Sequence, residues 1–162
     1  MDRNSKKTWV QALAADISKS ESVTVANFSA LTVAELSDLR NRAREKNARI
    51  KVTQNRLAKL ALKGTRFEGI APLFSGSTLI AYSDDPIISH KIIFGYAKDN
   101  QKVVVLGGAS EGKILDAAGV QDFALLPTLD EARAQLLALL KTLMGNLVRA
   151  LNARGEKLAS AA

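Results

Sequence analysis

The chain has 162 residues, of which 47% are hydrophobic, and its 23 basic and 16 acidic residues give a net charge of +7. The hydrophobic fraction is large enough for a packed core and excludes global disorder. The absence of cysteine excludes disulfides and thiolate metal sites.

Neither end of the chain carries an obvious targeting or spanning segment. Residues 1–7 lack the apolar stretch that a secretion signal needs. The longest aliphatic run near the C-terminus, Leu136 to Leu140, ends at Lys141, well short of the roughly 18 apolar residues of a membrane span. We therefore expect a soluble, intracellular protein with no membrane partner.

The N-terminal region predicts a helix over residues 5–18, followed by a strand over 23–28. One face of this helix is apolar and carries Trp9, Val10, Leu13, Ala14 and Ile17. A second helix begins after Thr32, because Thr32 and Glu35 have the spacing of a capping box.

Residues 49–53 alternate with a period of two, which predicts a strand. Ile50 and Val52 are expected to face the core, and Arg49, Lys51 and Thr53 to face away from it.

The next helix is expected to have Asn55 as its cap and to end at Gly64. At about 100° per residue, three of its cations fall within an arc of about 60°. These cations are Arg56, Lys59 and Lys63. The arc faces away from Leu57 and Ala61, so the helix carries a cationic stripe on its exposed side.

Further elements follow in alternation. They are a strand over 79–82, a helix opened by Asp85-Pro86, a strand over 102–106 and a helix over 116–125, which ends before Pro127. This alternation predicts an α/β domain over residues 1–127, with a small mixed or antiparallel sheet flanked by helices.

Residues 128–162 predict an extended C-terminal helix, because Thr128 and Glu131 repeat the capping-box spacing. Its leucines recur every 11 residues, close to three helical turns, so they return to one face. The expected protein-binding residues are Leu136, Leu140, Leu143, Leu147, Val148, Leu151 and Leu158. Such a stripe needs a partner, either another protein or a second copy of the chain.

Charge is concentrated between Arg40 and Arg66. This segment has ten basic residues and one acid, Glu45, so it carries +9 and the rest of the chain −2. That pattern is typical of a nucleic-acid binder. The segment has no aromatic residue, which disfavours stacking of single-stranded bases and favours recognition of a folded nucleic acid through phosphates and shape.

The basic residues of the second helix divide between its two sides. Arg40 and Arg44 flank one side of the buried stripe, and Arg42 and Lys46 flank the other. One RNA surface is not expected to touch both pairs.

No catalytic constellation is evident. Residues 107–113 have the glycine and lysine spacing of a phosphate-binding loop, but Ile114 stands where such a loop needs Ser or Thr for Mg²⁺. We expect a glycine-rich turn there. His90 is the only histidine, which leaves no histidine cluster for a metal. We therefore expect no enzyme activity and no cofactor.

Six short segments occur in the order of a known family. They are Leu31–Leu36, Lys51–Lys59, Gly64–Gly69, Gly76–Tyr82, Leu126–Thr128 and Asn146–Leu151. Together they resemble the L-ten family, the stalk-base proteins of the bacterial large ribosomal subunit, over nearly the whole chain.

The resemblance implies a non-enzymatic protein of the cytoplasmic ribosome, or of an organellar one. Its N-terminal α/β domain would bind large-subunit rRNA beside ribosomal protein L-eleven. Its C-terminal helix would carry dimers of the stalk protein L-seven/L-twelve, which recruit translation factor GTPases, and two adjacent apolar segments suggest two dimers. The RNA-binding residues would be Lys6, Lys7, Arg49, Lys51, Asn55, Arg56, Lys59 and Lys63. The alternative is an architectural or regulatory nucleic-acid binder that self-associates through this helix.

Overall fold

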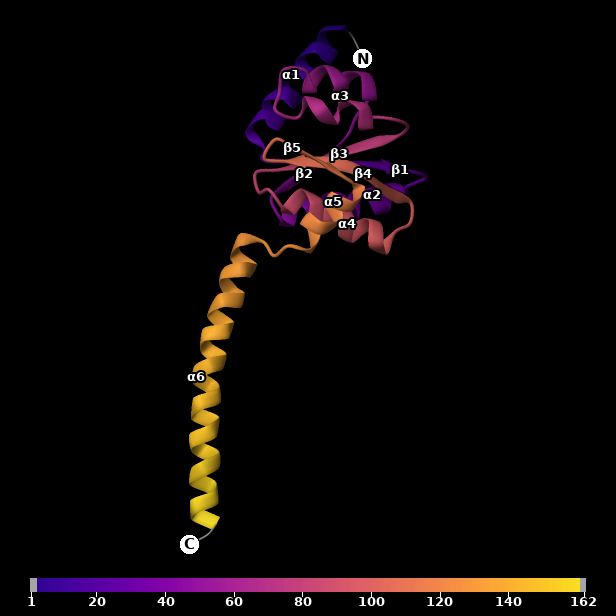
Figure 1. Ribbon diagram of the computed structural model, residues 1–162. Coiled ribbons are helices and arrows are strands. Elements are labelled where there is room, and N and C mark those ends of the chain that lie inside the picture. Colours follow the sequence, from indigo (N-terminus) through magenta and orange to yellow (C-terminus); the bar gives the residue numbers. More distant parts are fainter. Residues whose placement is uncertain (1–2, 161–162) are drawn as a thin grey trace. The chain divides into compact units, whose positions relative to one another are not determined.

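A computed structural model of the chain describes the backbone of residues 3–160 and the side chains of residues 4–154. The chain divides into two compact units, residues 1–126 and 127–162. Within the described residues, the first unit contains a five-stranded antiparallel sheet of order β2-β3-β1-β4-β5, with helices on both faces (Figure 1). The small antiparallel sheet flanked by helices that the sequence predicts is confirmed.

The strands are β1 (Ser22–Phe28), β2 (Ala48–Val52), β3 (Thr78–Ser83), β4 (Val103–Ser110) and β5 (Lys113–Asp116). The helices of the first unit are α1 (Arg3–Lys19), α2 (Val33–Glu45), α3 (Asn55–Leu62), the short 3-10 helix η1 (Glu68–Leu73), α4 (Ile88–Asp99) and α5 (Ala117–Leu125). The second unit contains α6 (Leu129–Ser160).

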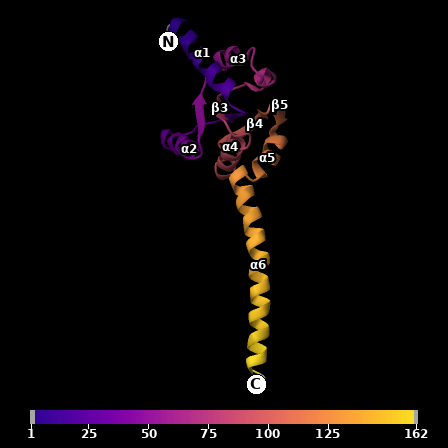
Figure 2. The ribbon, with the colours of Figure 1, turned by 90° about the vertical axis from the view of Figure 1, so that its left-hand side faces the viewer.

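Two apolar cores lie on opposite faces of the sheet. Helices α1 and α3 cover one face, where their buried residues Leu13, Ile17 and Leu62 pack with η1 and the sheet. Helices α2 and α4 cover the other face, where Leu39 and Ile93 are fully buried. The two helical layers are visible in perpendicular views (Figures 1 and 2).

The capping boxes that the sequence predicts are confirmed. The Thr32 hydroxyl accepts a hydrogen bond from the Glu35 backbone N–H at 3.3 Å, and the Glu35 carboxylate accepts one from the Thr32 N–H at 2.7 Å. Thr128 and Glu131 form the same pair of hydrogen bonds at the start of α6. Glu35 also accepts a hydrogen bond from Lys102, which together with those from Thr32 lowers the pKa of Glu35 to about 2.

The glycine-rich segment, residues 107–113, forms the predicted turn only at Glu111–Gly112, and Gly107 and Gly108 belong to a strand. Strand β4 continues to Ser110, and a tight connection at Glu111–Gly112 leads into β5, which the sequence reading missed. Gly108 lies beside β1, where an added Cβ would be 2.7 Å from the Val23 carbonyl oxygen. Glycine is therefore required here by close strand packing rather than by phosphate binding.

The predicted alternation of β2 is wrong at its end. Val52 is 41% exposed, whereas Thr53 is buried. Helices cover both faces of the sheet, so alternate side chains of β2 do not divide simply into core and solvent.

The helix expected to open at Asp85-Pro86 begins instead at Ile88. The carbonyls of Asp85 and Pro86 accept hydrogen bonds from the hydroxyls of Ser22 and Ser110. These bonds tie the segment to the strands and delay the start of the helix.

We predict that Gly108→Ala destabilises the protein by about 1–3 kcal/mol, because the new methyl group would overlap the Val23 carbonyl. Gly95→Ala is the matched control. Gly95 lies in α4 with no heavy atom near its added Cβ, so this change should leave stability equal or higher. Urea unfolding measures both, and equal stability of the two variants would contradict the close packing of β4 on β1.

Candidate nucleic-acid and protein interfaces

The three expected cations of the α3 region are exposed: Arg56 and Lys59 lie on the helix and Lys63 is its C-cap residue. These three residues are called the α3 cations. Ala58 and Leu62 of the same helix are buried in the core beneath α1. None of the three cations forms an ion pair with another described residue. Their charge is therefore available to an anionic ligand.

Two further expected cations lie on α1, which packs against α3 in the same layer (Figure 1). Lys6 and Lys7 are exposed near the start of α1. These two lysines and the α3 cations therefore belong to one helical layer.

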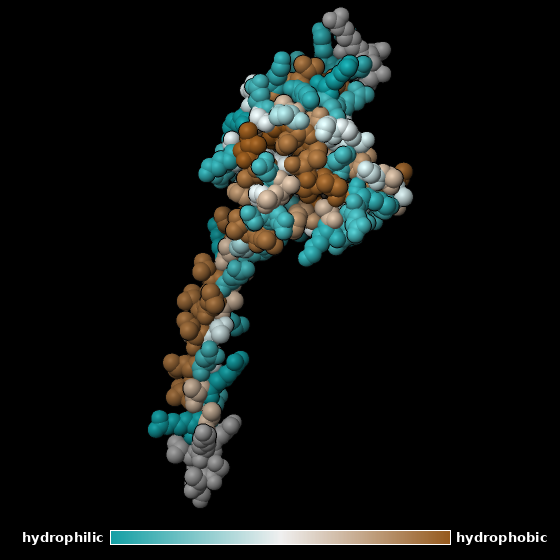
Figure 3. All heavy atoms as spheres, turned by 45° about the vertical axis from the view of Figure 1, so that its right-hand side comes forward, coloured by the Kyte–Doolittle hydropathy of each residue, from teal (hydrophilic) through white to brown (hydrophobic). Residues whose placement is uncertain are grey.

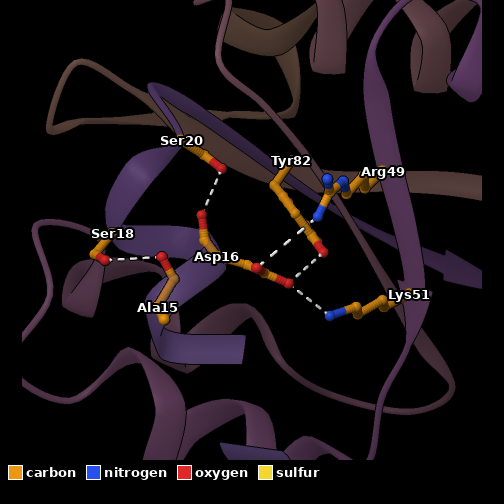
Figure 4. Close-up of polar contacts among 7 residues, drawn as sticks. All are labelled: Ala15, Asp16, Ser18, Ser20, Arg49, Lys51 and Tyr82. Carbon is orange, nitrogen blue, oxygen red and sulfur yellow. Dashed lines mark hydrogen bonds and ion pairs between the residues drawn. The ribbon is translucent and has the colours of Figure 1, made fainter. Parts of the chain in front are cut away.

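Lys51 and Arg49 are connected to α1 through Asp16 (Figure 4). The Asp16 carboxylate accepts hydrogen bonds from Lys51 Nζ at 2.8 Å and from the Tyr82 hydroxyl at 3.0 Å. Arg49 lies farther away, with Nη1 3.9 Å from Asp16 Oδ1, and its side chain is mostly exposed. This cluster joins α1 to β2 and β3.

Mutual stabilisation shifts the pKa values in this cluster. The hydrogen bond from Lys51 is the main cause that lowers the pKa of Asp16. Partial burial alone would lower the pKa of Lys51, but its hydrogen bonds with Asp16 and Tyr82 outweigh burial and raise it. Lys51 therefore stays charged, with part of its charge compensated by Asp16.

Asn55 does not cap α3 as the sequence predicts. The N-cap is Gln54, which makes no side-chain capping bond. The Asn55 side chain instead donates to the Gly76 carbonyl at 2.8 Å and accepts from the Thr78 hydroxyl at 2.6 Å. These bonds connect the start of α3 to the start of β3.

The two sides of α2 differ in their partners. Arg42 pairs with Asp99 at 3.1 Å and lies over the Tyr96 ring. Arg40 and Arg44 form no ion pair with a described residue. Arg42 is therefore compensated by Asp99, whereas the charges of Arg40 and Arg44 have no ion-pair partner among the described residues.

A groove of about 530 Å³ runs along the outer side of β2, the edge strand of the sheet. We call it the edge groove; its lining includes Trp9, Arg40, Arg44, Arg49, Lys51 and Tyr82. Trp9, Arg40 and Arg44 are not among the site residues expected from the sequence, because Trp9 is distant in sequence and the arginines belong to another helix. The sequence feature that could have indicated the two arginines is the net charge of +9 on residues 40–66.

The expected C-terminal helix over residues 128–162 is confirmed as α6, which runs from Leu129 to Ser160 and continues through Gly155. Its apolar side chains gather along one side (Figure 3). The predicted residues Leu136, Leu140, Leu143, Leu147, Val148 and Leu151 are each more than half exposed. Leu158 lies outside the residues whose side chains the structure describes.

The stretch Leu129–Arg154 is long and apolar enough to cross a membrane by length and composition alone. This finding differs from the expectation of no such segment, which rested on the absence of a long uninterrupted apolar run. Lys141 and Arg149 lie outside the leucine stripe at about 100° per residue. A helix whose single apolar side is covered by another protein also meets this criterion of length and apolar composition.

The residues considered for catalysis form no site in the described part of the chain. No group of three or more metal-ligating side chains occurs there. His90 is fully buried, and its Nδ1 lies 2.8 Å from the Thr24 hydroxyl in a hydroxyl network with Ser89 and Ser22. Burial lowers the pKa of His90 to about 4.

Comparison with known proteins gives a consistent result. The family model described as ribosomal protein L10 matches residues 1–98. Proteins named large ribosomal subunit protein uL10 from Brucella canis, Brucella suis and Brucella abortus are each 48% identical over 142 residues. The matches cover 88% of this chain and 83% of each relative.

We predict that the imidazole of His90 titrates near pH 4 rather than 6.5. Because burial favours the neutral form, the unfolded chain takes up the proton first as the pH falls. The contribution of His90 to stability is therefore present above pH 6.5, and about 3 kcal/mol is lost as the pH falls to 4. The histidine C2–H NMR signal is unambiguous because the chain has one histidine; a midpoint above pH 6 would contradict its burial.

Proposed function

The chain belongs to the ribosomal protein L10 family, and we propose that its two units bind two kinds of partner. As a family member it is a structural, non-enzymatic constituent of the large ribosomal subunit, in the cytoplasm. The α/β unit, residues 1–127, binds large-subunit rRNA beside ribosomal protein L-eleven. The helix of residues 128–162 anchors dimers of the stalk protein L-seven/L-twelve, which recruit translation factor GTPases.

The observation that supports RNA binding most directly is the set of unpaired cations on α3. Arg56, Lys59 and Lys63 are exposed and form no ion pair with a described residue. Cations that have no protein partner can pair with phosphates without first breaking an ion pair. Lys6 and Lys7 extend this surface along α1, and Arg49 and Lys51 extend it to β2.

Lys51 and Asn55, which also belong to the expected RNA-binding residues, have different roles in this proposal. Lys51 contributes less charge than an isolated lysine, because Asp16 compensates it. The Asn55 side chain is occupied by Gly76 and Thr78, so its contribution is to hold the start of α3 in place. In this proposal the α3 cations make the main phosphate contacts.

The leucine stripe of α6 supports the second partner. At about 100° per residue, Leu136, Leu140, Leu143, Leu147 and Leu151 fall within an arc of about 80°. Water contact along such a stripe is unfavourable by about 25 cal/mol per Å² of apolar surface, so a protein partner that covers it gains free energy. Two segments, one centred on Leu136–Leu143 and one on Leu147–Leu151, each correspond to one repeat of about 11 residues, or roughly 16 Å of helix, which suits one small dimer.

The third segment, around Leu158, is the poorer one. The residues that accompany it in the sequence repeat, Ala159 and Ala162, have little apolar area to contribute. The proposal therefore contains two dimers, which give a pentamer with this chain.

We predict that replacing Arg56 and Lys59 together with Ala weakens binding to large-subunit rRNA and flattens its salt dependence. Loss of two phosphate contacts should reduce the slope of log K against log salt by about 1.4 to 1.8. The fold should persist, because both side chains are exposed.

The matched control for this RNA test is Lys98→Ala with Lys113→Ala. It removes the same charge from exposed lysines outside the basic segment. Titrations at several salt concentrations measure both variants. An equal change of slope in both would show that only net charge matters and would remove α3 from the interface.

We predict that Leu147→Asp with Leu151→Asp removes one stalk dimer and leaves the other. Charge placed in the stripe opposes burial of the second segment, while the first stays intact. Native mass spectrometry of the chain mixed with stalk protein counts the dimers directly.

Asn146→Asp with Asn152→Asp is the control for the stalk test. It adds the same charges outside the stripe, so both dimers should remain. Loss of every dimer in the leucine variant, or three dimers on the wild type, contradicts two independent segments.

A further inference from the structure

The edge groove brings together an aromatic ring and cations without ion-pair partners, which come from distant parts of the sequence. Trp9 comes from α1, Arg40 and Arg44 from α2, and Arg49 from β2. Helices α1 and α2 lie on opposite faces of the sheet (Figure 2). The groove therefore extends around the edge of the sheet from one helical layer to the other.

Trp9 is the available aromatic surface in this groove. Its side chain is half-buried, packs partly against the core and makes no ring–ring or cation–π contact within the described part of the chain. Tyr82 differs, because Lys51 lies over its ring at 5.6 Å and its hydroxyl is bonded to Asp16. Only Trp9 of these two rings is free to stack on a ligand.

The charges in the groove fit an anion. Arg40 and Arg44 have no ion-pair partner among the described residues, and Arg49 contacts Asp16 only at 3.9 Å. Asp16, Asp84 and Asp85 line an adjoining pocket that also contains Arg44 and Arg49. Of these acids only Asp16 forms ion pairs with described residues of the groove, and its closest cation is Lys51 at 2.8 Å. Three arginines therefore remain to contact phosphates, a ligand that guanidinium groups bind well.

The size of the groove, about 530 Å³, is in the range of about 300–1,000 Å³ for sites that enclose a small ligand. One nucleotide unit of a larger RNA has the size of such a small ligand. Proteins commonly hold unstacked bases against an aromatic ring or an arginine side chain. A protein strand added to β2 is the other occupant that an edge strand suggests. The cationic side chains of Arg49 and Lys51 on this strand oppose such pairing.

We propose that the edge groove binds one unpaired nucleotide of the folded RNA, with its base against Trp9 and its phosphates on Arg40, Arg44 and Arg49. This inference rests on the proposed RNA-binding function and adds a second contact area to it. The α3 cations contact base-paired regions of the RNA through phosphates alone. The edge groove instead binds where a base is unpaired and turned out of the RNA helix.

The test measures affinity of the full chain for large-subunit rRNA. Trp9→Leu keeps an apolar side chain for core packing but removes the ring, and it should weaken binding about ten-fold or more. Trp9→Phe keeps a ring and should retain most of the affinity. Arg40→Ala with Arg44→Ala should also weaken binding at least ten-fold, and urea unfolding checks that each variant is folded.

Arg42→Ala is the matched control on the same helix. Arg42 is already paired with Asp99, so its removal should leave RNA affinity unchanged. In the wild type, binding should also quench the fluorescence of Trp9, the single tryptophan of the chain. Quenching that is absent at saturating rRNA would overturn the stacked base.

The outcomes separate this inference from the function on which it rests. If Trp9→Leu and the Arg40/Arg44 variant bind as the wild type does, while the Arg56/Lys59 variant loses affinity, RNA binding stands and the groove proposal fails. If the arginine variant loses affinity but Trp9→Leu does not, the groove contacts phosphates only and the bound base is refuted. If the wild type does not bind rRNA, both proposals fail together.

Discussion

Strands β1 and β3 occupy the middle of the sheet and have almost no exposed side chain, so the sheet needs helices on both faces. Polar residues that these strands contain are satisfied internally, as Thr24 is by Ser89 and His90. The faces of the sheet are therefore closed to ligands. The outer sides of the helices and the edge strand β2 remain accessible, and the α3 cations, Arg40 and Arg44 lie there.

Compensation divides the many cations of the basic segment into two groups. Lys51 and Arg42 pair with Asp16 and Asp99, and Arg66 donates to two backbone carbonyls. Exposed ion pairs stabilise a fold by only about 0–1 kcal/mol, so the effect of these pairs on orientation matters more. In the proposed function, the α3 cations, Arg40 and Arg44, which have no ion-pair partner among the described residues, supply the electrostatic attraction for RNA. Net charge alone does not reveal this division.

The second unit is stabilised in a different way from the first. In α6 no core of its own covers the leucines, and the stripe formed by Leu136, Leu140 and Leu147 is exposed throughout. The helix is instead begun by its capping box and maintained by residues with high helix propensity. In the proposed function, a protein partner buries these leucines.

Local signals in the sequence determined the helices, both capping boxes, the cationic side of α3 and the leucine stripe of α6, because each depends on neighbours within a few turns. Tertiary structure decided what depends on distant residues. The carbonyls bound by Ser22 and Ser110 moved the start of α4, and close contact with β1 made the first part of the glycine-rich segment a strand. The edge groove also lay beyond the sequence, because Trp9 meets Arg40 and Arg44 only when α1 and α2 pack on opposite faces of one sheet. Periodicity reports which side of an element is apolar, but it does not report which other element, or which charge, that side will meet.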